Sequence, residues 1–552
     1  MKKVNVKIVG ILLAVCVILG SFAGCNNKES PEGPNKIEIS YSLGSFGEDW
    51  LNEAVEKFNS AFADKGYSAV VTRVDPAFVA ENIANEIKSY KDNTYDLYLG
   101  LGNNISLVDD SFSVLQKPGE SILEDLTDVY NSKVINLDGT EGTETVLQTR
   151  NPAMLPYQTY NFENQAFQGK YYGFQWTTAY GGIAMNRKVL NDFGYTDAPR
   201  TTREMKKICD DILGKKRVSG NGNTIYPITW PGQNCSGYSE YSLLTWMAQY
   251  MGIEDYTNFF KLQPKNGTIK DNGYEVYDNV GILYAFKAQE TFFAKEYAAE
   301  GTLENVDHLF ADNILMDGEA LFEFTGDWVY NEVVGMGDYD SEELSRLEII
   351  PVPVVSELAD KIGLVGSADE KDAVLSNIIK GVDDGKSDDV IAAENSVSAD
   401  KVAIVREARG IYFDLGESHQ ALIPSYSDAK DVAKLFLRFI SSKEFSDNVY
   451  SKKANGVTAN VAAVSNDTHF LKSLTNVCRK SYSTPIAEGI CMSLIRYKGA
   501  IVRTFEPMPH YGDFAKGMAE HATEYTAEKA FNKIKESMKK NWTSNYEKAY
   551  DE

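Results

Sequence analysis

Residues 170–187 read KYYGFQWTTAYGGIAMNR and form the stretch around which we expect the fold to be organised. Tyr172, Phe174 and Trp176 alternate with other residues, and this spacing predicts an extended strand with its aromatic rings on one face. A glycine pair at 181–182 is expected to give the backbone angles that a side chain would forbid, before an apolar strand resumes. Two interpretations stay open: the stretch crosses between two lobes, or it is an ordinary core strand with a bulge.

The length and composition of the chain narrow the classes of protein that it can be. A chain of 552 residues is too long for one core and predicts at least two domains. Hydrophobic content of 43% and a mean hydropathy of -0.32 are typical of a soluble globular protein. The net charge of -24 and the absence of a basic face argue against nucleic acid as a partner. The 32 tyrosines favour clefts lined by rigid rings.

The first 24 residues have the pattern of an export signal. Three lysines precede an apolar run at 8–19, which is short for a membrane span, and small residues follow it. The sequence FAGC at 22–25 resembles a bacterial lipobox, with Phe22 where leucine is usual. The resemblance implies that Cys25 becomes a lipid-modified N-terminus, so that the protein is lipid-anchored at the outer face of the cell membrane. An uncleaved membrane anchor is the alternative, and in both cases the bulk of the protein lies outside the cytoplasm.

Alternating and helical periodicities predict an α/β fold after a polar tether at 25–36. Strands are expected at 37–41, 67–74 and 95–99, with helices between them, which is a βαβαβ pattern and a mostly parallel sheet. Ser45 and Glu48 have the spacing of a capping box, and so do Thr201 and Glu204. Further elements are predicted in the rest of the chain: strands at 320–324 and 349–355, the latter at an edge or a crossing because of its prolines, and helices at 429–440 and near the C-terminus.

Four stretches occur in an order that resembles one family. They read SLGSFGEDWLNEAVEKFN, YYGFQWTTAYGGIAMNRKVLNDFG with PRTTREM, MDGEALFEFTGDW, and HQALIPSYSDAKDVAKLFLRFISSKEF. Together they resemble the extracellular solute-binding proteins of family 1, the sugar-binding components of ABC importers. The resemblance implies two α/β lobes that close on a ligand. The implied parts are a signal at 1–24, lobe 1 at 37–175 with part of 356–460, lobe 2 at 176–350 with C-terminal helices from 461–552, and a helix-prone insertion at 360–409.

The resemblance also implies where the ligand binds. In the family a tryptophan after the strand stacks on a sugar ring, and here that position is Trp328, with Asp327 beside it. Asp327 departs from the small residue or proline that is usual there. The other cleft segments of the family correspond here to Phe46, Glu48, Asn103, Trp176 and Tyr180.

Sugar recognition needs flat apolar rings and planar polar groups, and these residue types gather in one further place. Trp230, Tyr238 and Glu240 flank a glycine-bearing loop and are further candidates for a ligand contact. Each aromatic candidate also fits a packed core position, and Glu48 also fits a helix cap. Tyr241 and Trp246 fall within a helical run and are predicted to be core residues.

Catalytic and metal-binding motifs are missing from the sequence. It contains no GxSxG, HExxH, P-loop or CxxC, and its five histidines lack metal-ligand spacing. We therefore expect a monomeric, non-enzymatic sugar receptor without a cofactor or metal, which delivers its ligand to an ABC permease. A surface-anchored glycoside hydrolase is the rival, with Glu48, Glu240 and Asp327 as its candidate carboxylates. A binding protein for a peptide or another solute is the third class. Pairing of Cys478 with Cys491 stays open.

Overall fold

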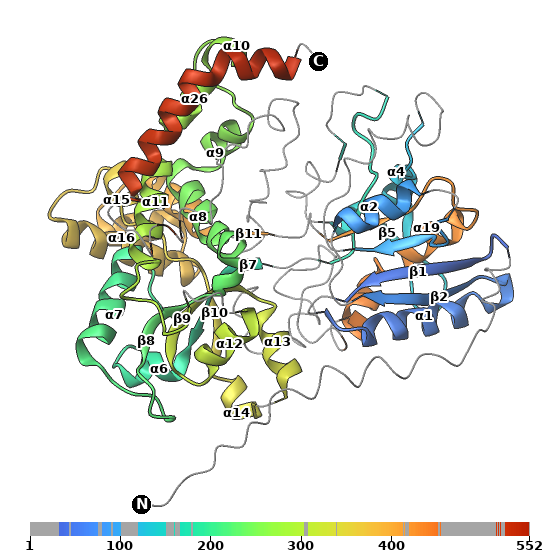
Figure 1. Ribbon diagram of the computed structural model, residues 1–552, viewed down its shortest axis with the longest axis horizontal. Coiled ribbons are helices and arrows are strands. Elements are labelled where there is room, and N and C mark those ends of the chain that lie inside the picture. Colours follow the sequence, from blue (N-terminus) through green and yellow to red (C-terminus); the bar gives the residue numbers. More distant parts are fainter. Residues whose placement is uncertain are drawn as a thin grey trace, which may run out of the picture.

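The computed structural model describes residues 33–43, 46–75, 80–89, 92–100, 120–150, 159–160, 166–177, 180–302, 307–337, 339–411, 413–414, 419–450 and 525–550, with the single residues 453, 515, 517 and 519. The predicted signal, most of the tether, Cys25, Asn103 and both distal cysteines lie outside these ranges. Figure 1 shows that the helices and strands divide into two lobes. Among the described residues, no helix has the length and apolar character that a membrane crossing requires.

Lobe 1 is built on a five-stranded sheet with the order β2-β1-β3-β12-β6. Strand β1 runs parallel to β2 and β3, whereas β12 is antiparallel to β3 and β6. The strands are β1 Lys36–Ser42, β2 Ser68–Asp75, β3 Leu97–Leu99, β6 Phe174–Gln175 and β12 Gln420–Leu422, and a separate hairpin consists of β4 Lys133–Ile135 and β5 Glu141–Thr145. The helices of lobe 1 are α1 Asp49–Ala61, α2 Ala80–Lys88, α4 Thr127–Asn131, α19 Lys430–Phe439 and α20 Lys443–Phe445.

The helices of lobe 1 cover both faces of its sheet. On one face, Trp50 and Phe58 of α1 and Phe436 of α19 pack in one cluster with the strand residues Ile37 and Ile39. On the other face, α2 packs on side chains from β3 and β12. The alternation of Ile37, Ile39 and Tyr41 correctly predicted β1. The helical spacing of apolar residues that follows correctly predicted α1.

Lobe 2 has a four-stranded sheet with the order β10-β7-β9-β8, and β11 also pairs with β7. Its strands are β7 Tyr180–Asn186, β8 Tyr226–Thr229, β9 Ala320–Gly326, β10 Leu347–Ile350 and β11 Phe413–Asp414. Its helices are α6 Arg187–Asp192, α7 Thr202–Lys215, α8 Cys235–Met251, α9 Ile253–Phe260, α10 Ile269–Asn272, α11 Val280–Phe292, α12 His308–Met316, α13 Val329–Met336, α14 Ser341–Leu344, α15 Leu358–Lys361, α16 Ala368–Asp383, α17 Asp388–Asn395, α18 Ala399–Gly410 and α26 Ala527–Tyr550. Short 3-10 turns lie in lobe 2 at Gly232–Asn234 and Gly273–Asp278. Lobe 1 has 3-10 turns at Ala63–Lys65 and Leu147–Thr149 and a π-helical turn at Ser446–Tyr450.

The sheet of lobe 2 is the middle of three layers. Alternate residues of β7 divide between its two faces: Ile183 and Met185 pack in the large cluster with α7, α8 and α11, whereas Ala184 packs with α12 and α13. Helices α15 to α18, which contain the predicted insertion at 360–409, pack in the same large cluster. Helix α26 lies along α10 and α11 and contributes Trp542 to it (Figure 1). The insertion and the C-terminal helix are thus parts of lobe 2.

Among the described elements, the order of the strands shows two places at which the chain changes lobes. The first passage follows β6 and ends where β7 begins at Tyr180, within the stretch that the sequence singled out. The second change of lobe lies between β11 of lobe 2 and β12 of lobe 1, and residues 415–418 of this connection lie outside the described residues. The proline-bearing stretch after β10 is not a crossing, because Val352 and Val354 are still in the core of lobe 2. The sequence also allowed this stretch to lie at a sheet edge. That alternative is correct for β10, which is the outer strand in the order β10-β7-β9-β8.

The sequence predicted a capping box at the start of two helices, and the two predictions have different outcomes. Thr201 caps α7, as predicted, by accepting a hydrogen bond from the backbone N–H of Glu204 at 3.1 Å. The other half of the predicted box is not formed, because the Glu204 carboxylate accepts from the backbone N–H of Arg200 at 2.7 Å. The predicted box at Ser45 and Glu48 is wrong in its register, because Glu48 is itself the N-cap of α1. Its side chain makes no capping hydrogen bond, and it is exposed.

Candidate functional site

Two glycines face each other where β7 begins and β9 ends, because Gly181 and Gly326 are register partners. A Cβ atom on Gly181 would lie 2.5 Å from Cγ of Tyr241, and one on Gly326 would lie 2.0 Å from Cζ3 of Trp328. Such distances are too short for any real Cβ, so only glycine lets both rings lie against the strand ends. The prediction that the glycine pair serves unusual backbone angles is wrong, since neither Gly181 nor Gly182 has a positive φ. The pairing of β7 with β9 also runs without a bulge.

The rings over these glycines form what we call the aromatic wall: Tyr238 and Tyr241 of α8 with Trp328, which is the N-cap of α13. Trp328 meets Tyr241 edge to face, with ring centroids 5.6 Å apart, and Tyr238 at 6.1 Å. The indole N–H of Trp328 lies near the phenol of Tyr238 and partly offsets the rise in the pKa of that phenol. All three side chains are partly exposed. Edge-to-face packing of this kind fixes the rings in place while their outer surfaces stay accessible.

The aromatic wall lies at the end of lobe 2 that is closest to lobe 1. Asp327, next to Trp328, acts electrostatically on Tyr450 of lobe 1 and helps to raise the pKa of that phenol, although burial is the main cause. The hydroxyl groups of Tyr450 and Thr177 are 2.5 Å apart, and Thr177 immediately precedes the first passage between lobes. A ligand on the wall would therefore lie beside the junction between the lobes.

Three carboxyl groups lie behind the wall. Asp312 of α12 and Glu323 of β9 have no exposed surface, and Asp312 lies close enough to Glu323 and to Glu332 of α13 for their charges to act on it. The carboxyl oxygens of Asp312 and Glu323 have no hydrogen-bond partner among the described residues. Burial, and then the neighbouring carboxyls, raise the pKa of Asp312 well above its ordinary value. Burial likewise raises the pKa of Glu323. Carboxyl groups this close and this dry cannot all ionise, so they hold protons in the folded state.

The charge of this carboxyl cluster reaches the wall. Burial raises the pKa of Tyr238, and the negative charge of Glu332 adds to the effect. Outside the cluster, Nε2 of His308 lies 3.7 Å from Oε1 of Glu332. Among the described residues, no group of three His, Cys, Asp or Glu side chains is arranged to hold a metal ion.

The predicted contacts in lobe 1 lie in its core. Trp176 is only 1% exposed and stacks on Trp50 at a centroid distance of 5.4 Å, with the ring planes 13° apart. Its indole N–H donates to the backbone oxygen of Gly100 at 3.1 Å. Phe46 is 3% exposed and packs edge to face on Trp176. In this conformation neither ring has a free face for a sugar. The role of Trp176 and Phe46 as ligand contacts stays a prediction, and their burial argues against it.

The remaining candidates divide between core and surface. Trp230 is 1% exposed and packs on Phe293, so it is a core residue in this conformation. Glu240 follows Tyr238 on α8 and is partly exposed, and its charge adds to the raised pKa of Tyr241, for which burial is the main cause. Tyr180 begins β7, and Asn103 lies outside the described residues. The structure therefore brings together Trp328, Asp327, Tyr238 and Glu240, but not the candidates of lobe 1.

Sequence reasoning missed two parts of this arrangement. Tyr241 was predicted to be core, yet it is partly exposed and belongs to the wall, whereas Trp246 is fully buried as predicted. The carboxyl cluster was also missed. Its signal was Glu323, an acidic residue in the middle of the apolar strand ALFEFTG.

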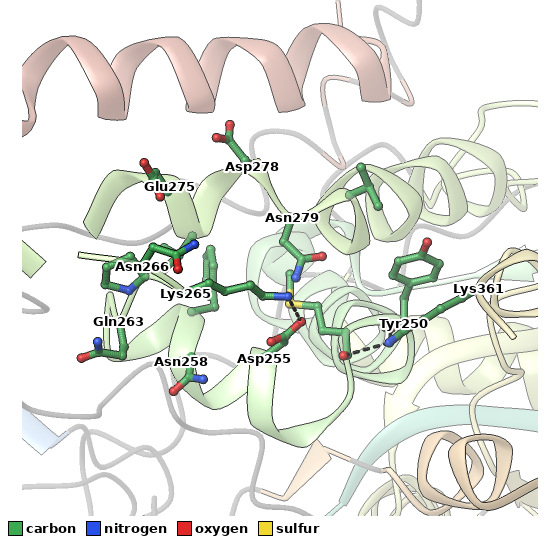
Figure 2. Close-up of a pocket in the computed structure, with 15 residues that line it drawn as sticks. Tyr250, Asp255, Asn258, Gln263, Lys265, Asn266, Glu275, Asp278, Asn279 and Lys361 are labelled. Atoms are coloured by element: carbon green, nitrogen blue, oxygen red, sulfur yellow. Dashed lines mark hydrogen bonds and ion pairs between the residues drawn. The ribbon is translucent and has the colours of Figure 1, made fainter. Parts of the chain in front are cut away.

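A cavity of about 490 Å³ opens elsewhere on lobe 2, at the C-terminal end of α8 and beside α9 (Figure 2). Lys265 reaches across it to Asp255 at 3.1 Å, and Lys361 caps backbone oxygens at the end of α8. No residue of the aromatic wall lines it, and neither does any other candidate site residue that the structure describes.

Solved structures with the same fold are solute-binding proteins. The maltose-bound MalE3 of T. maritima is 14% identical with a TM-score of 0.52, covering 91% of this chain and 99% of that one. RafE in complex with raffinose is 12% identical with a TM-score of 0.53, covering 91% and 99%. The bacterial solute receptor AcbH, described as exclusively preferring β-D-galactopyranose, is 12% identical with a TM-score of 0.52, covering 89% and 99%. No family model and no curated protein matches the sequence. At these identities the likeness establishes the two-lobe α/β fold.

Proposed function

We propose that this protein captures a carbohydrate, an oligosaccharide, between its two lobes and delivers it to an ABC permease. The observation that carries the proposal is the aromatic wall of Trp328, Tyr238 and Tyr241. These rings lie over the register partners Gly181 and Gly326, at the end of lobe 2 beside the junction between the lobes. Partly exposed rings match the apolar CH faces of sugars, and the adjacent, partly exposed Glu240 supplies a planar acceptor for hydroxyl groups. Asp327 would reach a sugar only after a rearrangement, because it is fully buried in this conformation. MalE3 and RafE, which share the fold, have solved structures with maltose and raffinose bound.

The mechanism is a shift between open and closed arrangements of the lobes. A ligand that contacts both lobes only when they are closed favours the closed state by the difference in its affinity for the two states. Such a closure would turn about the two places where the chain changes lobes, between β6 and β7 and between β11 and β12. The permease then distinguishes the closed, loaded protein from the open one.

The carboxyl groups near the wall favour a binding protein over a glycoside hydrolase. A hydrolase needs two carboxyls about 5–10 Å apart that both reach the substrate. Asp312, Glu323 and Asp327 have no exposed surface in this conformation, and Glu48 lies on lobe 1. Of the described carboxyls beside Tyr238, Glu240 is partly exposed, and Glu332 has a side chain that is 11% exposed and lies close to the buried Asp312. The protein on this account does no chemistry on the sugar.

One experiment tests the proposal and the rival together. The full chain is titrated by calorimetry with a panel of oligosaccharides, and the same mixtures are analysed for cleavage products. Saturable binding without products is the expected result. Products would establish the hydrolase instead, and binding of peptides but of no sugar would move the protein to the third class.

Membrane attachment through Cys25 belongs to the same proposal, because an anchored receptor would stay close to a permease in the membrane. It rests on the lysines, the apolar run and the FAGC sequence at 22–25. When expressed with its signal in bacteria, the wild type should partition into the detergent phase and carry the mass of a diacylglycerol. Cys25→Ser should lose both properties, and an unchanged mass and partitioning would refute lipidation at this residue.

A further inference from the structure

Three arginines from separate segments of lobe 2 line one cavity of about 510 Å³. Arg187 begins α6, Arg200 lies just before α7, and Arg409 lies near the end of α18. In a chain with a net charge of -24, three guanidinium groups around one hollow stand apart from the general acidic surface. The cavity is on lobe 2 and contains no residue of the aromatic wall.

Arg409 is held in place but is not satisfied. Its Nε and Nη2 donate to the two carboxylate oxygens of Asp383, each at 2.9 Å, and only 6% of its side chain is exposed. Its Nη1 is buried and has no hydrogen-bond partner in the part of the chain that the structure describes. A buried charged donor without a partner is costly, so such a group points to an acceptor that comes from outside the chain.

The other two arginines differ in how firmly they are held. Arg187 donates from Nη1 to the backbone oxygen of Thr196 at 2.8 Å, and its Nη2 pairs with Glu348, so both terminal nitrogens of its guanidinium group have partners. Arg200 is paired through Nη2 with Asp197 at 2.9 Å, and the side chain of Asp197 is 63% exposed. An exposed pair of this kind contributes little, about 0–1 kcal/mol, so another anion can replace Asp197 at low cost.

We propose that this arginine pocket binds a small oxyanion, a phosphate, sulfate or carboxylate group, which takes the place of Asp197 on Arg200 and accepts from Nη1 of Arg409. Guanidinium groups suit this chemistry because their N–H donors match the spacing of oxyanion oxygens. Asp383 keeps Arg409 oriented, and its own charge restricts the site to one small anion. Bound there, the anion joins the segment before α7 to the α16–α18 helices and should stabilise their docking.

The test uses sodium phosphate, sulfate and acetate as probes, each against sodium chloride of equal ionic strength. Binding is measured by calorimetry and by the thermal midpoint of the full chain, since a ligand specific for the folded state raises it. We expect at least one probe to bind saturably and to raise the midpoint. Comparison of the three probes identifies the preferred oxyanion. Equal effects of all salts and chloride would overturn the proposal.

Variants locate the site. Arg200→Gln should weaken the preferred probe at least tenfold, and Arg409→Lys should do the same because lysine has no counterpart of Nη1. Asp197→Asn should strengthen binding by removing the competing carboxylate. Arg203→Gln is the matched control, because Arg203 lies three residues further on, at the start of α7, and does not line the cavity. If Arg409→Lys proves unstable, Arg200→Gln and Asp197→Asn decide, and unchanged affinity in both would refute the site. None of these results depends on sugar binding.

Discussion

Trp176 and Trp328 occupy equivalent places in sequence, each just after a strand of its lobe, yet the structure gives them opposite environments. Trp176 is enclosed by Trp50 and Phe46, and its N–H is satisfied by a backbone oxygen. Trp328 keeps part of its surface open, lies against Gly326 and packs edge to face with Tyr238 and Tyr241. The difference teaches that an aromatic residue marks a site only when its surroundings leave a face free.

What lies behind the rings differs as well. In lobe 1 the cluster continues into apolar side chains of α1 and α19. In lobe 2 the wall is backed by Asp312 and Glu323, buried carboxyls that weaken the fold when they ionise. Lobe 1 thus uses its tryptophan for stability, and lobe 2 places its tryptophan over a less stable, polar layer.

The largest effect is expected for Trp176→Ala. Removing a fully buried, stacked indole leaves a cavity and should cost about 3–5 kcal/mol of unfolding free energy. Chemical denaturation of the ligand-free protein measures this loss, and calorimetry on the fraction that stays folded should give a near-normal sugar affinity. A stable variant with weak binding would instead place Trp176 in the site.

Trp328→Ala should give the converse result. Truncating an aromatic anchor costs on the order of 2 kcal/mol of binding free energy, which is a roughly thirtyfold weaker dissociation constant. Trp328→Phe keeps part of the stacking surface and should lose less. Because the ring is partly exposed, the unfolding free energy should change less than for Trp176→Ala. A large loss of stability with unchanged affinity would remove Trp328 from the site.

The carboxyl cluster predicts how stability depends on pH. The folded state holds protons on Asp312 and Glu323 to a higher pH than the unfolded chain, since both pKa values are raised. Stability is therefore fully present below the unfolded-state pKa of about 4 and falls as pH rises through the folded pKa values, by about 1.4 kcal/mol per pH unit for each proton.

Asp312→Asn removes one of these protons from the balance. The variant should gain stability over the wild type as pH rises, measured by denaturation at several pH values. Asp192→Asn is the control, because Asp192 forms an exposed ion pair with Lys188 on α6, and this variant should show no such trend. A wild type whose stability is flat above pH 5, matched by Asp312→Asn, would contradict the proton-holding cluster.

The smallest effect concerns Glu48, the exposed N-cap of α1. Glu48→Gln should leave the unfolding free energy within about 0.5 kcal/mol, because the side chain makes no capping bond. If it accepts a hydroxyl of the sugar, affinity should fall about fivefold, the difference of about 1 kcal/mol between a charged and a neutral acceptor. Unchanged affinity would leave Glu48 as a surface residue.

Local patterns in the sequence predicted most elements of the fold, because periodicity reflects which face of an element is buried. Strands β1 and β9, helix α19 and the Thr201 cap all follow from spacing alone. The second passage at β11 and the placement of α15 to α18 did not follow, since they depend on contacts between distant segments.

The burial of Trp176 and Trp230 was unpredictable for the same reason, because it depends on Trp50 and Phe293. The role of Gly181 shows the limit most clearly. Its sequence context suggested unusual backbone angles, but the space it leaves is filled by the ring of Tyr241, a residue 60 positions further along the chain.

The account is tested most directly by small-angle X-ray scattering of the full chain during titration with the tightest-binding oligosaccharide. If the sugar is held between the lobes, the radius of gyration should fall in proportion to the bound fraction determined by calorimetry, and Trp328→Ala should require correspondingly more sugar for the same change. A sugar that saturates the protein while the scattering curve stays unchanged would contradict capture between closing lobes.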